Sequence, residues 1–222
     1  MRRGRPRRAN ERRGPARHAR LAEREEGGGA LVEDEPHALL ARAGLGEGDA
    51  RAELLASAKD RAEHAFVVAA IRDALAPVCE AISIPEEPVV RSLPHVHHLA
   101  TPIAGTLTLR SHALDLAARL HPTPALCGSP KAAARAFILA NEAQPRGWYG
   151  GAVGWFDTEG DGAFGVAIRS ALTLGADAWI YAGAGIVRGS DPERELVETI
   201  AKERAMREAL DASVEGAADL AP

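Results

Sequence analysis

The most distinctive stretch of this chain is Leu120-His-Pro-Thr-Pro-Ala-Leu-Cys-Gly-Ser129, which occurs together with Gly183-Ala-Gly-Ile-Val187 and Glu195-Leu-Val-Glu-Thr199. A generic globular domain has no need of these three stretches together. They therefore mark the part of the chain in which a function should be sought. The expected secondary structure around them follows from hydrophobic periodicity and from capping residues.

Helices are predicted on both sides of the first stretch. Apolar residues from Leu54 to Ala69 recur at helical spacing, which predicts a long amphipathic helix over 51–81. Further helices are expected over 111–120 and over 129–142, the latter starting with a cap and a proline at Ser129-Pro130. A short helix is also expected over 36–43.

The second half of the chain reads as strands followed by one helix. Residues 89–107 alternate loosely and are expected to be extended. Strands are predicted over 148–156, 163–173 and 178–183, and the turn residues between them predict antiparallel hairpins. A last helix begins after Ser190-Asp191-Pro192 and is expected to end near Leu210.

The N-terminal segment differs in composition from the rest. Residues 1–50 hold 11 Arg and 9 Asp or Glu, and the first 30 residues contain almost no large apolar side chain. Such a segment cannot bury enough surface to offset the entropy of ordering, so residues 1–50 are predicted to be disordered. The alternative is an arginine tail that binds polyanions. The expected organisation is this segment, a folded domain over 51–212 and a tail over 213–222.

Several classes of protein are disfavoured by composition. No apolar run approaches about 18 residues, so no membrane association is expected. The net charge of −4 gives no attraction to nucleic acid. Cys79 and Cys127 are too few for a disulfide framework or a zinc site, which predicts a reduced, cytoplasmic protein.

Acidic residues on two helices are the first candidates for chemistry. Glu195, Glu198 and Lys202 share one helix face, and Glu63 lies within the earlier helix. Carboxylates that converge from separate helices suit Mg²⁺, provided that the fold brings Glu63 and Glu198 together. The alternative is two solvated faces, with a Glu–Lys pair on the last helix.

Other candidates are a basic residue, a glycine-rich loop and a histidine. Arg169 lies in a predicted apolar strand, where it would bind a carboxylate if buried and be solvated if exposed. Gly183-Ala-Gly185 permits close approach of the backbone to a ligand. His98 is predicted to be a neutral hydrogen-bonding group near a substrate or a structural histidine. Zinc bound by His95 and His97 is disfavoured because nearby partners are absent.

In their order and spacing these features resemble isochorismate synthases, which are relatives of anthranilate, aminodeoxychorismate and salicylate synthases. The resemblance runs from about Leu54 to Leu210. The blocks that carry it are Leu55-Ala-Ser-Ala-Lys-Asp-Arg-Ala-Glu-His64, His98-Leu-Ala-Thr-Pro102, His121-Pro-Thr-Pro-Ala-Leu-Cys-Gly128, Gly147-Trp-Tyr-Gly-Gly-Ala-Val-Gly-Trp155, Ile168-Arg169, Ala182-Gly-Ala-Gly-Ile-Val187 and Glu195-Leu-Val-Glu-Thr199. A local departure is the loop Glu142-Ala-Gln-Pro-Arg146.

The resemblance implies an α+β fold, namely the C-terminal part of the chorismate-utilising enzyme fold, in which antiparallel sheets pack face to face with outer helices. It also implies a binding site for chorismate and Mg²⁺. The implied metal residues are Glu63 and Glu198, with Glu195 acting through water. The implied substrate-binding residues are Arg169, Lys202, Gly183, Ala184, His98, Ala125 and Tyr149.

The implied reaction is the Mg²⁺-dependent isomerisation of chorismate to isochorismate, in menaquinone, siderophore or salicylate pathways. The resemblance also implies that the family's general base and general acid lie in segments outside this match. We therefore expect a partial chain, with a chain that supplies the missing half or with self-association as its partner. The alternatives are an inactive chorismate-binding fragment and a synthase of the anthranilate or salicylate type.

Overall fold

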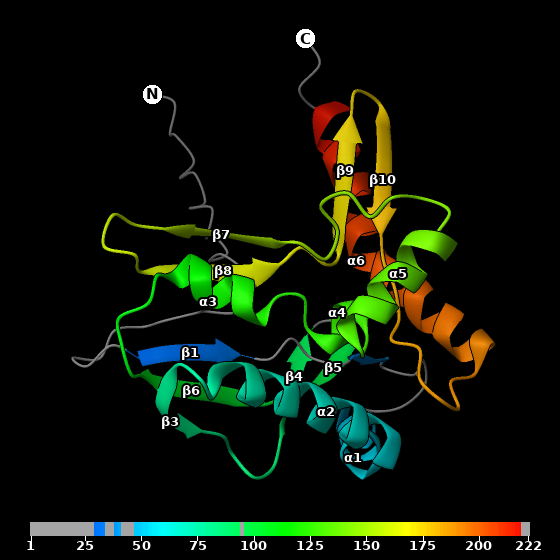
Figure 1. Cartoon of the computed structure of the whole chain (residues 1–222). Helices are drawn as coiled ribbons and strands as arrows, with labels where there is room; N and C mark the ends of the chain where they lie inside the picture. The colour runs from blue at the N-terminus through cyan, green and yellow to red at the C-terminus, as the bar shows by residue number, and fades with distance from the viewer. Residues whose placement is uncertain (1–28, 34–37, 41–46, 94–95, 219–222) are drawn as a thin grey trace, which may run out of the picture.

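The computed structural model of this chain describes residues 29–33, 38–40, 47–93 and 96–218. Within them lie small antiparallel sheets and helices, as Figure 1 shows. The helices are α1 (Glu47–Ala56), α2 (Ala58–Leu75), α3 (Ala113–Leu120), α4 (Pro124–Cys127), α5 (Lys131–Asn141) and α6 (Pro192–Ala218). The fold is thus α+β, as predicted.

The strands are β1 (Gly29–Glu33), β2 (Ala38–Leu40), β3 (Cys79–Ser83), β4 (Val89–Leu93), β5 (Val96–Ala100), β6 (Pro102–Leu107), β7 (Ala152–Phe156), β8 (Gly162–Val166), β9 (Ser170–Leu174) and β10 (Asp177–Tyr181). They form two three-stranded sheets, in the orders β1-β6-β3 and β2-β5-β4, and two hairpins, β7–β8 and β9–β10. All pairs are antiparallel. In the centre of the first sheet, a Cβ on Gly105 would lie only 2.7 Å from the Cys79 Sγ, so a larger residue there would displace the Cys79 side chain.

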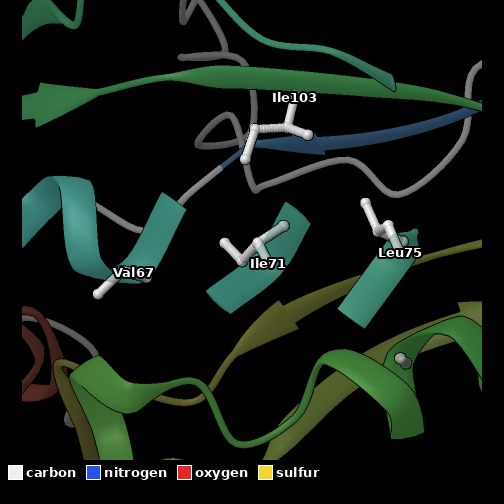
Figure 2. Close-up of a cluster of buried hydrophobic side chains, with 5 residues drawn as sticks. Val67, Ile71, Leu75 and Ile103 are labelled. Atoms are coloured by element: carbon white, nitrogen blue, oxygen red, sulfur yellow. The ribbon is translucent and has the colours of Figure 1, made fainter. Parts of the chain in front are cut away.

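The hydrophobic core lies between α2 and the sheet that contains β6. Its buried members Val67, Ile71 and Leu75 follow one stripe of α2, and Ile103 of β6 meets them (Figure 2). Ala117 of α3 completes the cluster. The spacing of three and four residues on α2 is therefore the pattern that sets this part of the fold.

The long helix predicted over 51–81 is interrupted. Ser57 adopts an extended conformation between α1 and α2, and its hydroxyl accepts a hydrogen bond from the backbone N–H of Asp60. A serine hydroxyl competes with the helical backbone for hydrogen bonds and favours a cap, which explains the break. The C-terminal part of the prediction is also wrong, because Cys79–Ser83 forms β3 on the edge of β6.

The prediction for residues 1–50 was wrong where the structure describes them. Gly29–Glu33 pairs with β6, Ala38–Leu40 pairs with β5, and α1 begins at Glu47. The helix expected over 36–43 is a strand at 38–40, because pairing with a neighbouring strand overrides local propensity. The remaining residues of 1–50 and of 36–43 lie outside the described part of the chain.

Other predicted elements agree to within a few residues. Helix α3 falls inside 111–120, and the hairpins β7–β8 and β9–β10 pair as expected. The strand predicted over 163–173 is instead split into β8 and β9. Helix α5 starts at Lys131 with Pro130 rather than Ser129 as its N-cap residue. Helix α6 runs to Ala218, so the tail predicted over 213–222 is helical up to that residue.

None of the helices in the described part of the chain is both long enough and apolar enough to cross a membrane.

Candidate functional site

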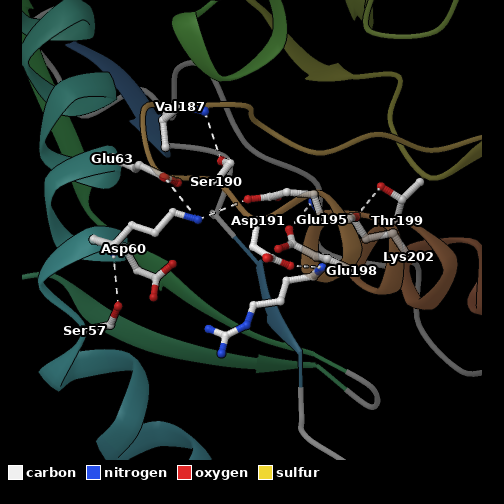
Figure 3. A network of polar contacts seen from close by, with 12 residues as sticks. Ser57, Asp60, Glu63, Val187, Ser190, Asp191, Glu195, Glu198, Thr199 and Lys202 are labelled. Atoms are coloured by element: carbon white, nitrogen blue, oxygen red, sulfur yellow. Dashed lines mark hydrogen bonds and ion pairs between the residues drawn. The ribbon is translucent and has the colours of Figure 1, made fainter.

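The candidate site lies between α2 and α6, where acidic and basic side chains alternate. Ser57 caps the N-terminus of α2. On this helix, Lys59 and Glu63 are four residues, about one turn, apart. The Asp191 carboxylate accepts the backbone N–H of Arg194 and thereby caps α6, the helix that carries Glu195 and Lys202. In Figure 3, Glu63 of α2 and Glu195 of α6 point toward one another.

Two lysines connect the carboxylates. The Lys59 ammonium donates a hydrogen bond to Glu195 Oε1 at 3.1 Å and lies 3.7 Å from Glu63 Oε1. The Lys202 ammonium lies 2.6 Å from Glu198 Oε1 and donates a hydrogen bond of 3.1 Å to the carbonyl of Gly183. Lys59 therefore joins α2 to α6, and Lys202 joins α6 to the glycine-containing loop.

The electrostatics of the cluster follow from burial and from charge. Burial raises the pKa of Glu63; the Lys59 ammonium opposes this rise, whereas Asp60, Glu195 and Glu198 add to it. Burial lowers the pKa of Lys59, but the hydrogen bond with Glu195 and the neighbouring carboxylates outweigh this effect, so the pKa is raised overall. The charge of Glu198 thus makes the smallest contribution to the raised pKa of Glu63.

The chemistry of the donor set fits a hard divalent cation. Glu63 Oε1 is buried and accepts no hydrogen bond, so its lone pairs are available to a cation. Carboxylate oxygens are the ligands that Mg²⁺ prefers. Within the described residues, no group of three or more His, Cys, Asp or Glu side chains is drawn together as a metal-binding group. The carboxylates of Glu63, Glu195 and Glu198 instead contact Lys59 and Lys202.

Arg169 and His98 form a second polar pair. Arg169 lies in a bend between β8 and β9, where the Ile168 N–H donates to the Val166 carbonyl, and its own φ is +48°. Its guanidinium donates to Nε2 of fully buried His98 at 2.8 Å. Since arginine can only donate, the His98 Nε2 must be an acceptor and the imidazole neutral. The prediction of a strand position for Arg169 was wrong: a left-handed residue interrupts the pairing.

Tyr149 connects the glycine-containing loop to a further basic residue. Its ring stacks on Tyr181 with a centroid distance of 5.7 Å, and a Cβ on Gly183 would lie 3.0 Å from its hydroxyl oxygen. The Arg146 guanidinium lies 5.9 Å from the Tyr149 ring centroid and donates to the Leu126 carbonyl at 2.8 Å. Burial raises the pKa of Tyr149, Arg146 opposes this rise, and Glu142 adds to it.

His64 of α2 and Thr101 form a buried polar pair. His64 lies next to Glu63, and its Nε2 is 2.6 Å from the hydroxyl oxygen of Thr101, which follows β5. In the same sheet, His97 Nδ1 is 2.9 Å from the Ser92 hydroxyl oxygen, so this histidine has a structural partner. His95 lies outside the described residues.

Comparisons with known proteins identify the family of this chain. The sequence profile of chorismate binding enzymes matches residues 45–211. This chain belongs to that family. The match begins a few residues before Leu54, where the resemblance was expected to start. It covers α2, α6 up to residue 211 and every candidate residue named above.

Relatives within the family are isochorismate synthases. The chain is 48% identical to the salicylate biosynthesis isochorismate synthase of Pseudomonas aeruginosa, over 79% of this chain and 38% of that protein. It is 49% identical to the isochorismate synthase DhbC of Bacillus subtilis, over 72% of this chain and 40% of that protein. The chain therefore spans about two fifths of the length of these relatives.

Solved structures show the same family fold. A crystal structure assigned to the 2,3-dihydroxybenzoate-specific isochorismate synthase of Bacillus anthracis superposes with a TM-score of 0.81 and 38% identity, covering 86% of this chain and 52% of that one. The anthranilate synthase component I of Streptococcus pneumoniae superposes with a TM-score of 0.66 and 28% identity, covering 84% of this chain and 45% of that one.

The structure brings together most of the residues predicted from the sequence. Glu63 and Glu195 meet at Lys59, Glu198 and Gly183 meet at Lys202, and α6 carries one acid of each group. Tyr149 lies next to Gly183.

Four predicted residues, including His98, lie apart from these contacts. Arg169 contacts His98. Ala184 follows Gly183 in the same loop and is half-buried. Ala125 lies on α4 and packs partly against the hydrophobic core.

Sequence analysis missed Lys59, Arg146 and the His64–Thr101 pair as parts of this region. Lys59 is four residues before Glu63, a spacing that places both on one helix face and could have drawn attention to it. Arg146 donates to the carbonyl of Leu126 in α4, twenty residues earlier in the chain, and no local signal indicates such a contact.

Proposed function

We propose that this chain acts in the conversion of chorismate to isochorismate as an Mg²⁺-dependent member of the isochorismate synthase branch. One observation carries the proposal: acidic side chains of α2 and α6 converge around two lysines, in a chain that is nearly half identical to isochorismate synthases. The free thiols of Cys79 and Cys127 support placing this activity in the cytoplasm.

Glu63 and Glu198 are the proposed holders of Mg²⁺, and the ion would supply charge neutralisation and orientation for a substrate carboxylate. Supporting this role, Glu63 Oε1 is buried without a hydrogen-bond partner. Glu195 is the most buried of the three acids and is hydrogen-bonded to Lys59. It therefore contributes negative charge and a water-mediated contact rather than a direct ligand.

Arg169 and Lys202 are proposed to bind the second carboxylate of chorismate. A planar guanidinium can donate two parallel hydrogen bonds to a carboxylate, and the His98 imidazole fixes its orientation by accepting one other N–H. Lys202 is held at the carbonyl of Gly183 and is thereby positioned at the loop whose backbone N–H groups at Gly183 and Ala184 face the ligand in this proposal. Tyr149 and Ala125 would shape the pocket.

The choice of product rests on the degree of similarity. In the structural superpositions, identity is 38% and 31% with two isochorismate synthases and 28% with the anthranilate synthase component. We therefore favour water, rather than ammonia, as the nucleophile. The relatives include proteins named for salicylate and menaquinone biosynthesis, and the pathway of this chain stays open among them.

The proposal is tested by incubating the purified chain with chorismate and Mg²⁺ and separating the products chromatographically. Isochorismate that forms only when Mg²⁺ is present supports the proposal. An aromatic product such as anthranilate or salicylate contradicts the product assignment.

A second candidate is a chain that binds chorismate and Mg²⁺ without turning chorismate over. It is favoured by the coverage of only about two fifths of the relatives. Calorimetric titration separates the two candidates: Mg²⁺-dependent chorismate binding without product would support the second.

A further inference from the structure

Arg146 connects two segments of the chain that each carry a proposed pocket residue. Its guanidinium donates from Nη1 to the carbonyl of Leu126 in α4 and from Nε to Oε2 of Glu142, both at 2.8 Å. The Nη2 group donates to the other carboxylate oxygen of Glu142, so this ion pair is bidentate. The half-buried guanidinium is therefore held in one plane by partners from two separate segments.

Helix α4 benefits from this contact because it is only one turn long, from Pro124 to Cys127. A helix of this length has little stability of its own, and the carbonyls at its C-terminal end have no partner within the helix. The Leu126 carbonyl is one of these, and Arg146 supplies its donor from twenty residues further along the chain. Ala125, the proposed pocket residue next to Leu126, is thereby held in place.

The same arginine begins the turn that presents Tyr149. The backbone N–H of Tyr149 donates to the Arg146 carbonyl at 2.9 Å, so the two residues are the ends of a four-residue turn. The Arg146 guanidinium lies 5.9 Å from the Tyr149 ring centroid, within the range of a cation–π contact. The ring stacks on Tyr181, and its hydroxyl lies beside Gly183. Movement of Arg146 would therefore displace the ring relative to the glycine-containing loop.

Glu142 sets the direction in which the guanidinium points. It is the C-cap residue of α5, so the ion pair joins the end of this helix to the turn that follows. Because Nε and Nη2 are both bound to the carboxylate, the remaining Nη1 is directed at the Leu126 carbonyl. A lysine ammonium is a single point charge on a flexible stem and cannot reproduce this planar arrangement.

We propose that Arg146 is a positioning residue that fixes Ala125 and Tyr149 relative to each other at the chorismate pocket. This inference rests on the proposed function, which assigns Ala125 and Tyr149 to that pocket. Arg146 acts through these two residues and does not itself contact the substrate. Since a misplacement of about 1 Å can cost about a hundredfold in rate, a contact of this kind matters for binding and turnover even though it lies behind the pocket.

The test uses the tyrosines of the chain as probes, because Tyr149 and Tyr181 are its only two and they stack on each other. Fluorine NMR of the full chain labelled with 3-fluorotyrosine should give two signals, which Tyr181→Phe assigns. Arg146→Met should shift or broaden the Tyr149 signal, and Arg146→Lys should shift it less, because the ammonium restores the charge alone. The matched control Arg135→Met, at an exposed position on α5, should leave the signal unchanged.

Titration of chorismate with Mg²⁺ into the same labelled chains reports on the pocket. The chorismate concentration that half-saturates the change in the Tyr149 signal should rise about tenfold or more in Arg146→Met, and less in Arg146→Lys. If Arg146 only stabilised the fold, its loss would lower the melting temperature, but folded molecules would keep the signal and the affinity of the unchanged chain. That result in Arg146→Met would overturn the proposal.

Arg146→Lys decides the question by the same two criteria if Arg146→Met does not fold, which circular dichroism establishes. An unchanged Tyr149 signal and an unchanged half-saturating concentration in Arg146→Lys would then overturn the proposal. A Tyr149 signal that does not respond to chorismate in the unchanged chain contradicts the proposed function. The comparison of Arg146→Met with Arg135→Met in the absence of chorismate still decides whether Arg146 positions Tyr149.

Discussion

The two sides of this molecule are built in opposite ways. Around α2 and β6, apolar side chains such as Ile71 and Ile103 are buried in the core. Around α6, the charged side chains face inward and apolar ones such as Ile200 face outward. The first arrangement stabilises the fold by burial, whereas the second assembles a cluster of charges. Helix α2 takes part in both, because Ile71 lies in the core and Glu63 lies in the cluster.

The largest expected effect is a difference in the free energy of unfolding between a variant in the core and a variant on α6. Ile71→Ala removes buried methyl groups from the core and should lower the free energy of unfolding by about 2–5 kcal/mol. Ile200→Ala, at a site that is 56% exposed, should change it by about 0.5 kcal/mol or less. Urea denaturation of both variants measures the difference. Equal losses would show that α6 is a core element.

The next effect concerns binding through the Arg169–His98 pair. Arg169→Ala should weaken chorismate binding by about 1.5–4 kcal/mol, because charge-assisted hydrogen bonds are lost. Arg169→Gly should weaken binding equally but be more stable than Arg169→Ala by about 1 kcal/mol, since φ is +48° and glycine tolerates this conformation. Calorimetric binding and thermal unfolding check the two parts. Unchanged affinity in both variants would exclude the clamp.

A smaller effect should follow from breaking the link between the helices. Lys59→Met removes the ammonium that contacts Glu195 and Glu63, and leaves two partly buried carboxylates facing each other without a cation between them. We expect the melting temperature to fall without Mg²⁺, and the rise in melting temperature on adding Mg²⁺ to be larger than in the unchanged chain. Lys131→Met, on the exposed start of α5, is the matched control. Identical Mg²⁺ responses of the two variants would contradict the role given to Lys59.

The smallest expected effect is a pH dependence of stability that arises from the Glu142–Arg146 pair. The Glu142–Arg146 hydrogen bonds hold the pKa of Glu142 below its usual value. A carboxylate with a depressed pKa stabilises the fold above its unfolded-state pKa of about 4.3, and this contribution is lost as pH falls through the folded-state pKa. Glu142→Gln should therefore cost at most about 1 kcal/mol at pH 7, because the pair is largely exposed, and progressively less below pH 4. A constant difference across pH would contradict this origin.

Much of the fold could be predicted because its signals are local. Asp191 before Pro192 marked the start of α6, and the turn residues after Phe156 marked the β7–β8 hairpin. The break at Ser57 could not be predicted with equal ease, since a single hydroxyl decides between a cap and a continuous helix. The strand at 38–40 was missed because its pairing with β5 depends on distant residues.

The candidate site likewise has one part that follows from local spacing and another that depends on tertiary structure. The shared faces of Glu195, Glu198 and Lys202 follow from helical spacing alone. The contacts of Lys59 with Glu195 and of Arg146 with the Leu126 carbonyl join segments 136 and 20 residues apart, so they arise only in the folded chain. The left-handed conformation of Arg169 is likewise imposed by tertiary structure, since the sequence around it reads as a continuous strand.

The central claim is that the inward face of α6 and Glu63 of α2 bind one divalent cation together with chorismate. Calorimetric titration of Mg²⁺ in the presence of chorismate tests it most directly, using Glu198→Ala and, as a control on the exposed side of the same helix, Glu193→Ala. The account predicts saturable binding for the unchanged chain and for Glu193→Ala, and none for Glu198→Ala. Binding by Glu198→Ala with unchanged affinity would contradict it.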